Sequence, residues 1–475
     1  MANKEMFDDK NRDLSIEEIV EKVKSLVGKQ MVDIYATNDF SNKASFGYAI
    51  EEGAFNYQRN SKSEADFRSE NIELKVTPFR QNKDKTYSAK ERLVLNIINY
   101  MEEYKKTFEE SSLWTKNQTL LILFYEHIEK ISRENFIIKY AILHQFTEND
   151  LRIIKNDWKT IIDKIKAGKA HEISEGDTYY LGACTKGANS ESLRQQPFSP
   201  IMAKQRAFSL KTTYMTQIVR ELTSNTKKED SLFDYIDLIE DSIEDSILKK
   251  MSPYFGMSER ELLGLFGIES TAKNKFELIT NKILGIKRNL SSTPEFKKAN
   301  IKVKTIRVSS NDTIRESMSF PAFKYEDLVK EIWEESSIRL MFETTKFLFI
   351  VFREMNGEFH FDDVIFWNMP ITHIETNVKK VWEKTVDVVK HGNIVSGYKK
   401  NGDRKTNFPS TKFDSVCHVR PHGINKKDVY PLPIQDQYTG STVYTKHCFW
   451  LNNTYVLSII NRAKENSELN NELEA

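Results

Sequence analysis

An aspartate and a Glu-Leu-Lys sequence lie close together near residue 70. Asp66 precedes residues 72–76, where apolar and polar side chains alternate. If this segment is a β-strand, Glu73 and Lys75 project from one face, because successive side chains of a strand point to opposite faces. A bend before the strand then brings two carboxylates together beside an amine. Two carboxylates and a neighbouring backbone carbonyl make an all-oxygen site that suits Mg²⁺.

Such a site could hydrolyse a phosphodiester. A bound metal lowers the pKa of water from about 15.7 towards about 7 in the best cases. Lys75 could orient the resulting hydroxide or offset charge that develops on the phosphorus. In a chain with 29% charged residues, however, the same pattern also describes a solvated strand face with an aspartate in the preceding turn.

The composition is that of an ordinary globular protein, with 475 residues of which 39% are hydrophobic. This length predicts two to four domains. The three cysteines, Cys184, Cys417 and Cys448, lack the spacing of a zinc site, and their odd number argues against a disulfide framework. The polar N-terminus and the absence of an apolar run of about 18 residues argue against secretion and membrane insertion. We therefore expect a cytoplasmic protein.

Capping signals and apolar stripes predict the elements around the motif. Ser15 begins a capping box that an amphipathic helix follows, and a second capping box at Ser88 predicts another helix. A third helix is expected over residues 150–166, and strands are expected over residues 120–125 and 179–183. This mixture predicts an α/β or α+β lobe.

Charge is distributed unevenly along the chain, although the net charge is only +1. Residues 273–307 contain ten Lys or Arg and two acids, whereas residues 229–245 contain eight acids and no Lys or Arg. A localised basic stretch suits a surface that follows a nucleic-acid backbone, and a solvated face is the alternative. The acidic segment has apolar residues at helical spacing, which predicts a connecting helix between two domains.

The second half of the chain repeats the first. Residues 295–304 align with residues 66–75 without a gap, so that Glu295 replaces Asp66 and Lys302 replaces Glu73. A cation at a metal-ligand position repels Mg²⁺ and attracts phosphate. The second lobe is therefore expected to bind nucleic acid without cutting it. Further matches follow in the same order. Residues 382–392 match 158–168 at an offset of 224, and residues 419–425 match 183–189 at an offset of 236. Lys446 with residues 449–451 matches Lys204 with residues 208–210.

These residues resemble the MutH-like branch of the PD-(D/E)XK nuclease superfamily, and most closely its tandem-domain type II restriction endonucleases that recognise GATC. The resemblance implies an α/β (mixed α+β) fold of two tandem lobes, each a central mixed sheet flanked by helices. We expect a catalytic domain at residues 1–228, a helical linker at 229–269 and a degenerate DNA-binding domain at 270–475. The most specific segments are residues 47–51, 65–66 with 72–79, 113–117, 180–189 and 204–211.

The resemblance also implies roles for individual residues. Asp66 and Glu73 would hold Mg²⁺, Lys75 would serve the attacking water, and Glu51 would be an auxiliary acid near a second metal ion. Lys116 would contact the substrate phosphate from the next strand. Glu52 is an alternative to Glu51, and a solvated lysine at the edge of a strand is the alternative reading of Lys116.

In this family a loop before the last strands carries contacts to base edges. In the first lobe that loop is residues 185–189, where Cys184 and Thr185 replace an Arg-Pro pair of the single-domain relative. The second lobe keeps Arg420 followed by proline, and an arginine can bind guanine O6 and N7 bidentately. The candidate DNA contacts are Lys186, Lys211, Arg420, Lys302 and Lys304, with phosphate contacts or plain surface charge as alternatives.

The sequence thus predicts a Mg²⁺-dependent endonuclease that cuts double-stranded DNA at GATC, with the first lobe cutting and the second binding DNA as a possible effector. Dimerisation or looping on DNA with two sites, and a cognate DNA methyltransferase as genetic partner, follow from the same resemblance. The alternatives are a methyl-directed nicking endonuclease of mismatch repair and a DNA-binding sensor that does not cleave. A duplicated DNA-binding lobe disfavours the first alternative, and the intact Asp66, Glu73 and Lys75 disfavour the second.

Overall fold

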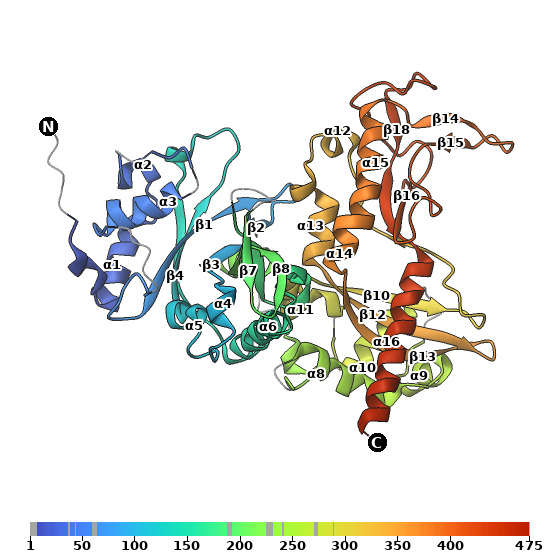
Figure 1. Ribbon diagram of the computed structural model, residues 1–475, viewed down its shortest axis with the longest axis horizontal. Coiled ribbons are helices and arrows are strands. Elements are labelled where there is room, and N and C mark those ends of the chain that lie inside the picture. The colour runs from blue at the N-terminus through green and yellow to red at the C-terminus, as the bar shows by residue number, and fades with distance from the viewer. Residues whose placement is uncertain are drawn as a thin grey trace. The chain divides into compact units, whose positions relative to one another are not determined.

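The chain folds into two compact units (Figure 1), one formed by Met1–Ile243 with Ser292–Asn300 and the other by Glu244–Ser291 with Ile301–Ala475. The computed structural model describes residues 7–36, 39–42, 44–58, 64–187, 192–224, 231–239, 242–269, 274–287 and 289–474, with side chains to residue 466. Within these ranges every helix is too short or too polar to cross a membrane.

The first unit contains a mixed sheet in the order β2-β1-β4-β5 and an antiparallel sheet in the order β3-β9-β6. Strands β1 and β4 are parallel, and the other neighbours in both sheets are antiparallel. The strands are β1 (Ile72–Gln81), β2 (Tyr87–Ala89), β3 (Leu93–Ile97), β4 (Thr119–Glu126), β5 (Ile138–Gln145), β6 (Leu181–Thr185), β7 (Leu193–Gln196), β8 (Ser199–Lys204) and β9 (Arg206–Leu210). The helices are α1 (Ile16–Leu26), α2 (Met31–Ile34), α3 (Ser45–Tyr48), a π-helical turn (Ala49–Ala54), α4 (Tyr100–Glu103), α5 (Ser112–Asn117), α6 (Glu148–Lys166), α7 (Thr212–Thr223) and α11 (Pro294–Ala299).

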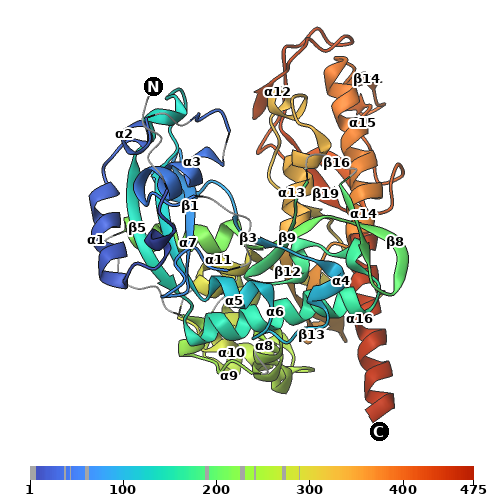
Figure 2. The ribbon, with the colours of Figure 1, turned by 60° about the vertical axis from the view of Figure 1, so that its left-hand side comes forward.

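Strand β4 forms the centre of the mixed sheet because its residues Leu120 to Tyr125 are all buried. A continuous apolar run of this kind is typical of a strand that is covered on both faces. Helix α1 packs through Ile19 and Val23 into the same core cluster as β1 and β4. Its predicted capping box is confirmed, since Ser15 and Glu18 exchange side-chain to backbone hydrogen bonds. Figure 2 shows α1 alongside β5 in this unit.

The second unit repeats the central strand pairing of the first unit. Its sheets are β10-β12-β13 and β11-β19-β16, and β10 runs parallel to β12 over eight residue pairs, as β1 does to β4. The strands are β10 (Ile301–Val308), β11 (Met318–Ser319), β12 (Lys346–Met355), β13 (Glu358–Asn368), β14 (Val395–Tyr398), β15 (Arg404–Thr406), β16 (Cys417–Pro421), β17 (Val429–Pro431), β18 (Val443–Thr445) and β19 (His447–Leu451). The helices are α8 (Ile243–Met251), α9 (Glu259–Leu265), α10 (Lys275–Leu284), α12 (Tyr325–Leu328), α13 (Ser337–Thr344), α14 (Ile371–His373), a π-helical turn (Ile374–Val378), α15 (Lys379–Lys390) and α16 (Asn453–Glu474).

The turn before the first strand is the same in both units. Asn71 and Asn300, which the sequence repeat aligns, have φ angles of 50° and 54°. Asparagine tolerates this left-handed conformation better than most residues. The shared turn precedes β1 and β10, which pair in parallel with β4 and β12. The predicted mixed α/β class is confirmed.

Two local predictions are wrong. The capping pattern at Ser88 begins no helix, because residues 87–97 form β2 and β3. In the described part of the acidic segment, residues 232–234 form a short 3-10 helix and the α-helix begins only at Ile243. The described part of this segment thus contains no continuous connecting helix. Residues 231–243 fold with the first unit and 244–269 with the second, which differs from the predicted linker at 229–269.

A buried carboxylate joins α6 to the start of β6 in the first unit. Asp157 is 1% exposed and accepts hydrogen bonds from the backbone N–H groups of Tyr179, Tyr180 and Leu181 at 2.6–2.9 Å. The ammonium group of Lys211 supplies the opposite charge. Three backbone donors and one buried lysine therefore depend on a single side chain.

We predict that Asp157→Ala lowers the free energy of unfolding by about 3–5 kcal/mol, because it leaves a buried cation uncompensated. Urea unfolding followed by circular dichroism measures the effect. Asp163→Ala, at an exposed position of the same helix, is the matched control and should change stability by less than about 0.5 kcal/mol. Equal effects of the two substitutions would contradict the assignment.

Candidate functional site

A tight turn fixes Asp66 at the start of β1. Phe67 and Ile72 exchange backbone hydrogen bonds of 2.9 and 3.1 Å across the turn. The carboxylate of Asp66 accepts a 2.9 Å hydrogen bond from the backbone N–H of Leu74. The aspartate is thereby held beside the strand that carries Glu73 and Lys75, as the sequence predicts.

Glu73 lies at the centre of the site. It is 3% exposed, and its Oε1 lies 2.7 Å from Lys75 Nζ and 3.3 Å from Lys116 Nζ. Its second oxygen, Oε2, is buried and has no hydrogen-bond partner among the described residues. Lys75 Nζ also donates to the backbone carbonyl of Leu95 at 3.4 Å. The structure therefore brings Glu73, Lys75 and Lys116 together.

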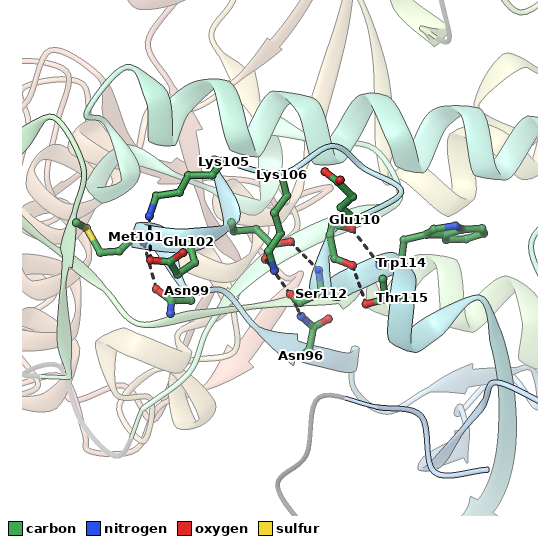
Figure 3. A network of polar contacts seen from close by, with 12 residues as sticks. Asn96, Asn99, Met101, Glu102, Lys105, Lys106, Glu110, Ser112, Trp114 and Thr115 are labelled. Atoms are coloured by element: carbon green, nitrogen blue, oxygen red, sulfur yellow. Dashed lines mark hydrogen bonds and ion pairs between the residues drawn. The ribbon is translucent and has the colours of Figure 1, made fainter. Parts of the chain in front are cut away.

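Lys116 reaches the site from a helix and not, as expected, from the next strand. It lies in the last turn of α5, immediately before β4. Glu103 holds the beginning of this helix by accepting hydrogen bonds from the backbone N–H and the hydroxyl of Ser112, at 3.1 and 2.9 Å. Asn96 of β3 donates to the same hydroxyl at 2.8 Å (Figure 3). These polar contacts fix the helix that carries Lys116.

Glu51 approaches the site from the π-helical turn Ala49–Ala54. Burial raises its pKa, and the negative charge of Glu73 raises it further. A Cβ atom added at Gly47 would lie 3.4 Å from Glu51 Oε1, so the absence of a side chain at Gly47 leaves room for this carboxylate. The electrostatic coupling of Glu51 to Glu73, Lys75 and Lys116 places it with the predicted site residues.

The carboxyl group of Asp66 carries the largest resolved pKa shift among the acids of this site. Burial and the neighbouring charge of Glu73 raise its pKa to about 7, although the charge of Lys75 and the Leu74 N–H act in the opposite direction. A carboxylate is costly to bury without a cation. The two lysines therefore do not fully offset the negative charge of the site, and the pKa of Asp66 stays raised.

The donors match the chemistry of a hard divalent cation, although they do not form a ready-made cage. In the described ranges no three His, Cys, Asp or Glu side chains are grouped closely enough to hold a metal ion. Glu73 is instead compensated by two ammonium groups. Two observations fit a divalent cation at this place: Oε2 of Glu73 has no partner among the described residues, and the pKa of Asp66 is raised.

Two residues around the site carry no recognisable sequence signal. Arg12 is 1% exposed and donates to the backbone carbonyls of Ala65 and Asp66 at 2.8 and 3.0 Å, which fixes the main chain at the aspartate. The hydroxyl of Tyr57 is buried and has no hydrogen-bond partner in the described part of the chain. Its pKa is raised by burial and by the charges of Asp66, Glu51 and Glu73. Only the contacts of Arg12 and Tyr57 in the folded protein show that these residues belong to the site.

The candidate DNA contacts fall in different environments. Lys186 is exposed just after β6, while Ala188 and Asn189 of the same loop lie outside the described residues. The prediction that Lys211 contacts DNA is wrong. Lys211 is 3% exposed, and its ammonium group donates to the backbone carbonyl of Thr178 beside Asp157. A cation held in the core in this way is not available to DNA.

In the second unit the candidate residues are more accessible. Arg420 is exposed at the end of β16, with its guanidinium 4.7 Å from the centre of the Trp450 ring. Lys302 is exposed on β10 at the register position that Glu73 has on β1. Lys304 is half-buried, and its pKa is lowered by burial and by the charge of Lys302. Glu295, the counterpart of Asp66, accepts hydrogen bonds from Ser231 Oγ and Leu232 N and serves the packing of the first unit.

Comparison with known proteins agrees with this geometry. Residues 55–157, which contain Asp66, Glu73, Lys75 and Lys116, match the family of the DNA mismatch repair enzyme MutH. The mismatch repair protein MutH of Shewanella woodyi is 26% identical over 217 residues, covering 43% of this chain and 91% of that protein. That of Vibrio campbellii is 26% identical over 174 residues, covering 36% of this chain and 74% of that protein.

A longer similarity extends through both units. The type II restriction enzyme Sau3AI of Staphylococcus aureus is 40% identical over 471 residues, covering 92% of this chain and 96% of that protein. The MutH similarity covers less than half of the chain, whereas this one includes both repeats. The protein therefore belongs to the family of type II restriction enzymes that is similar to Sau3AI and carries a MutH-like nuclease domain.

Proposed function

We propose that this protein cuts double-stranded DNA at GATC, with Mg²⁺ held in the first unit and with the second unit binding DNA. Membership of the type II restriction enzyme family makes the protein a site-specific endonuclease. The sequence resemblance to tandem GATC-recognising enzymes supports the choice of site. The single observation that carries the catalytic assignment is the buried Glu73 carboxylate, which is shared by two lysines and lies beside an aspartate of raised pKa.

The proposed work of each side chain follows from its position. Asp66 and Glu73 hold the cation through oxygen ligands, and Glu51 supplies further negative charge near them. Lys75 orients the attacking water, since its ammonium group is already fixed beside Glu73. Lys116 neutralises charge on the scissile phosphate from the last turn of α5. A divalent cation bound there would supply an activated water and offset the charge of the phosphate.

The second unit has the same central strand pairing as the first unit, but other side chains replace the proposed metal ligands. Lys302 occupies the register position of Glu73, so its ammonium disfavours a metal and favours a phosphate. Arg420 extends from the end of β16, and its stacking on Trp450 leaves a guanidinium that could read guanine. We propose that this unit binds a second copy of the site as an effector, by looping or dimerisation on DNA. A cognate DNA methyltransferase and a cytoplasmic location belong to the same proposal.

Supercoiled plasmid incubated with Mg²⁺ should be linearised and then cut into fragments whose ends map to GATC. Sequencing of the ends identifies the site. A plasmid that lacks GATC is the control and should stay supercoiled. Accumulation of nicked circles without linear product would instead favour the nicking activity of mismatch repair, and fragment ends at another sequence would refute the GATC assignment.

We predict that Glu73→Gln and Glu51→Gln each lower the cleavage rate, with Glu73→Gln costing on the order of 10²–10³-fold or more, because the cation loses a charged ligand. DNA binding in Ca²⁺ should be retained by both variants. Glu52→Gln, one residue away on the same turn, is the matched control and should cleave normally. If Glu52→Gln loses activity and Glu51→Gln does not, the two acids have been assigned the wrong way round.

The raised pKa of Asp66 predicts a pH-dependent cost in the metal-free protein. A folded-state pKa of about 7 against an ordinary value of 3.8 means that deprotonation destabilises the fold progressively as the pH rises through that interval. In EDTA, Asp66→Asn should therefore gain stability relative to the unmodified protein between about pH 5 and pH 8, as measured by thermal unfolding. Added Ca²⁺ at the higher pH should stabilise the unmodified protein and not the variant. A stability difference that is independent of pH would refute the electrostatic account.

A further inference from the structure

The second unit contains a hairpin that has no counterpart among the described residues of the first unit. Gly168 at the end of α6 and Gly392 at the end of α15 are equivalent. Both have a positive φ. A Cβ atom would meet the backbone carbonyl of Phe198 at Gly168 and that of Gln435 at Gly392. Between these glycines and the next matched strands, β6 and β16, the offset between the repeats grows from 224 to 236. This growth by twelve residues equals the length of hairpin β14–β15, residues 395–406.

The inserted hairpin is an ordered, exposed ribbon. Its strands pair only with each other, with Tyr398 opposite Arg404. The turn is closed by hydrogen bonds from Lys399 N to Asp403 O at 2.7 Å and from Gly402 N to Lys399 O at 2.9 Å. Residues 398–405 are all exposed. Because the hairpin adds little to the core, its packing does not explain its presence.

The hairpin is strongly basic. Lys399, Lys400, Arg404 and Lys405 stand against one acid, Asp403, and that acid lies 3.9 Å from Lys426 Nζ. Like charges crowded on an exposed ribbon repel each other unless an anionic partner compensates them. Their spacing along one short ribbon suits a polyanion better than a single small anion.

The hairpin also lies beside the loop that carries the candidate base-reading arginine. Lys426, which contacts Asp403 at the turn, belongs to the segment that follows Arg420 and β16. Arg404 lies over the ring of Tyr444 on β18, 5.1 Å from its centre. Figure 1 shows β14 and β15 extending from the end of the unit that also holds β16 and β18. The basic ribbon and the loop after β16 therefore form one surface.

We propose that hairpin β14–β15 is an arm that grips the phosphate backbone of duplex DNA bound by the second unit. This inference rests on the proposed DNA-binding function of that unit and assigns a surface to it. The lysines contact phosphates, and the hydroxyl of the 58% exposed Tyr398 provides a further donor. The arm extends the contact beyond the bases that Arg420 reads and adds affinity without sequence specificity.

Site-specific cross-linking tests the arm in the full chain. Cys184, Cys417 and Cys448 are buried, so a cysteine introduced at an exposed position can be labelled selectively with a photoreactive group. Lys400→Cys reports on the hairpin. Ile424→Cys reports on the neighbouring loop, where Ile424 is 93% exposed. Lys250→Cys reports on an exposed position of α8. Each is combined with Glu73→Gln so that a GATC duplex in Ca²⁺ stays intact.

We expect Lys400→Cys and Ile424→Cys to cross-link the duplex, and Lys250→Cys to give background only. Cross-linking at residue 424 without cross-linking at residue 400 would overturn the arm and leave the DNA-binding role of the unit intact. Failure at both positions would overturn both proposals. Capture of DNA by residue 250 at an equal level would mean non-specific association and would also overturn the arm.

Salt dependence provides an independent readout. Lys399→Ala combined with Lys400→Ala should reduce the slope of log affinity against log salt concentration by about 2, since each phosphate contact contributes about 1. Lys249→Ala with Lys250→Ala removes the same charge from α8 and should leave the slope unchanged. Equal slopes for the two double variants would show that the hairpin lysines do not contact phosphate.

Discussion

The burial of a carboxylate between two ammonium groups is the interaction on which the rest of the site depends. Glu73 is almost inaccessible to water, and a charge in that environment is tolerated only with compensation. Lys75 supplies one cation from the same strand, and Lys116 supplies the other from α5. Among the described residues, Oε2 of Glu73 has no hydrogen-bond partner, and the pKa of Asp66 is raised to about 7 despite the two lysines. The site therefore has an electrostatic demand that a divalent cation could meet.

The surrounding structure serves to hold these charges in place. Arg12 fixes the main chain at Asp66, and the contacts of Glu103 and Asn96 with Ser112 fix the beginning of α5. Side chains that act on a phosphate must be oriented before the substrate arrives, because flexible groups lose part of the available interaction energy in becoming ordered. The residues that surround the site in the first unit thus hold a few polar atoms in fixed positions.

The repeated architecture shows how one scaffold can serve two purposes. The parallel pair β1–β4 recurs as β10–β12 in the same register, and the turn residue Asn71 recurs as Asn300. On this common frame the replacement of Glu73 by Lys302 reverses the charge at one position. The second unit adds a basic hairpin at a place where the described chain of the first unit has none. Backbone geometry is thus retained while surface charge and side-chain chemistry diverge.

The sequence by itself determined the motif, the repeat and the helices with strong local signals. Asp66, Glu73 and Lys75 lie within ten residues, so a turn and a strand suffice to bring them together, and the capping box at Ser15 depends on neighbours only. The pattern at Ser88 failed because residues 87–89 pair with β1 and residues 93–97 pair with β9, and this strand pairing overrides a local capping preference. Only the tertiary structure placed Lys116 on a helix, buried Lys211 beside Asp157 and recruited Arg12 to the site. The last two outcomes depend on contacts between residues far apart in the chain, where spacing carries no information.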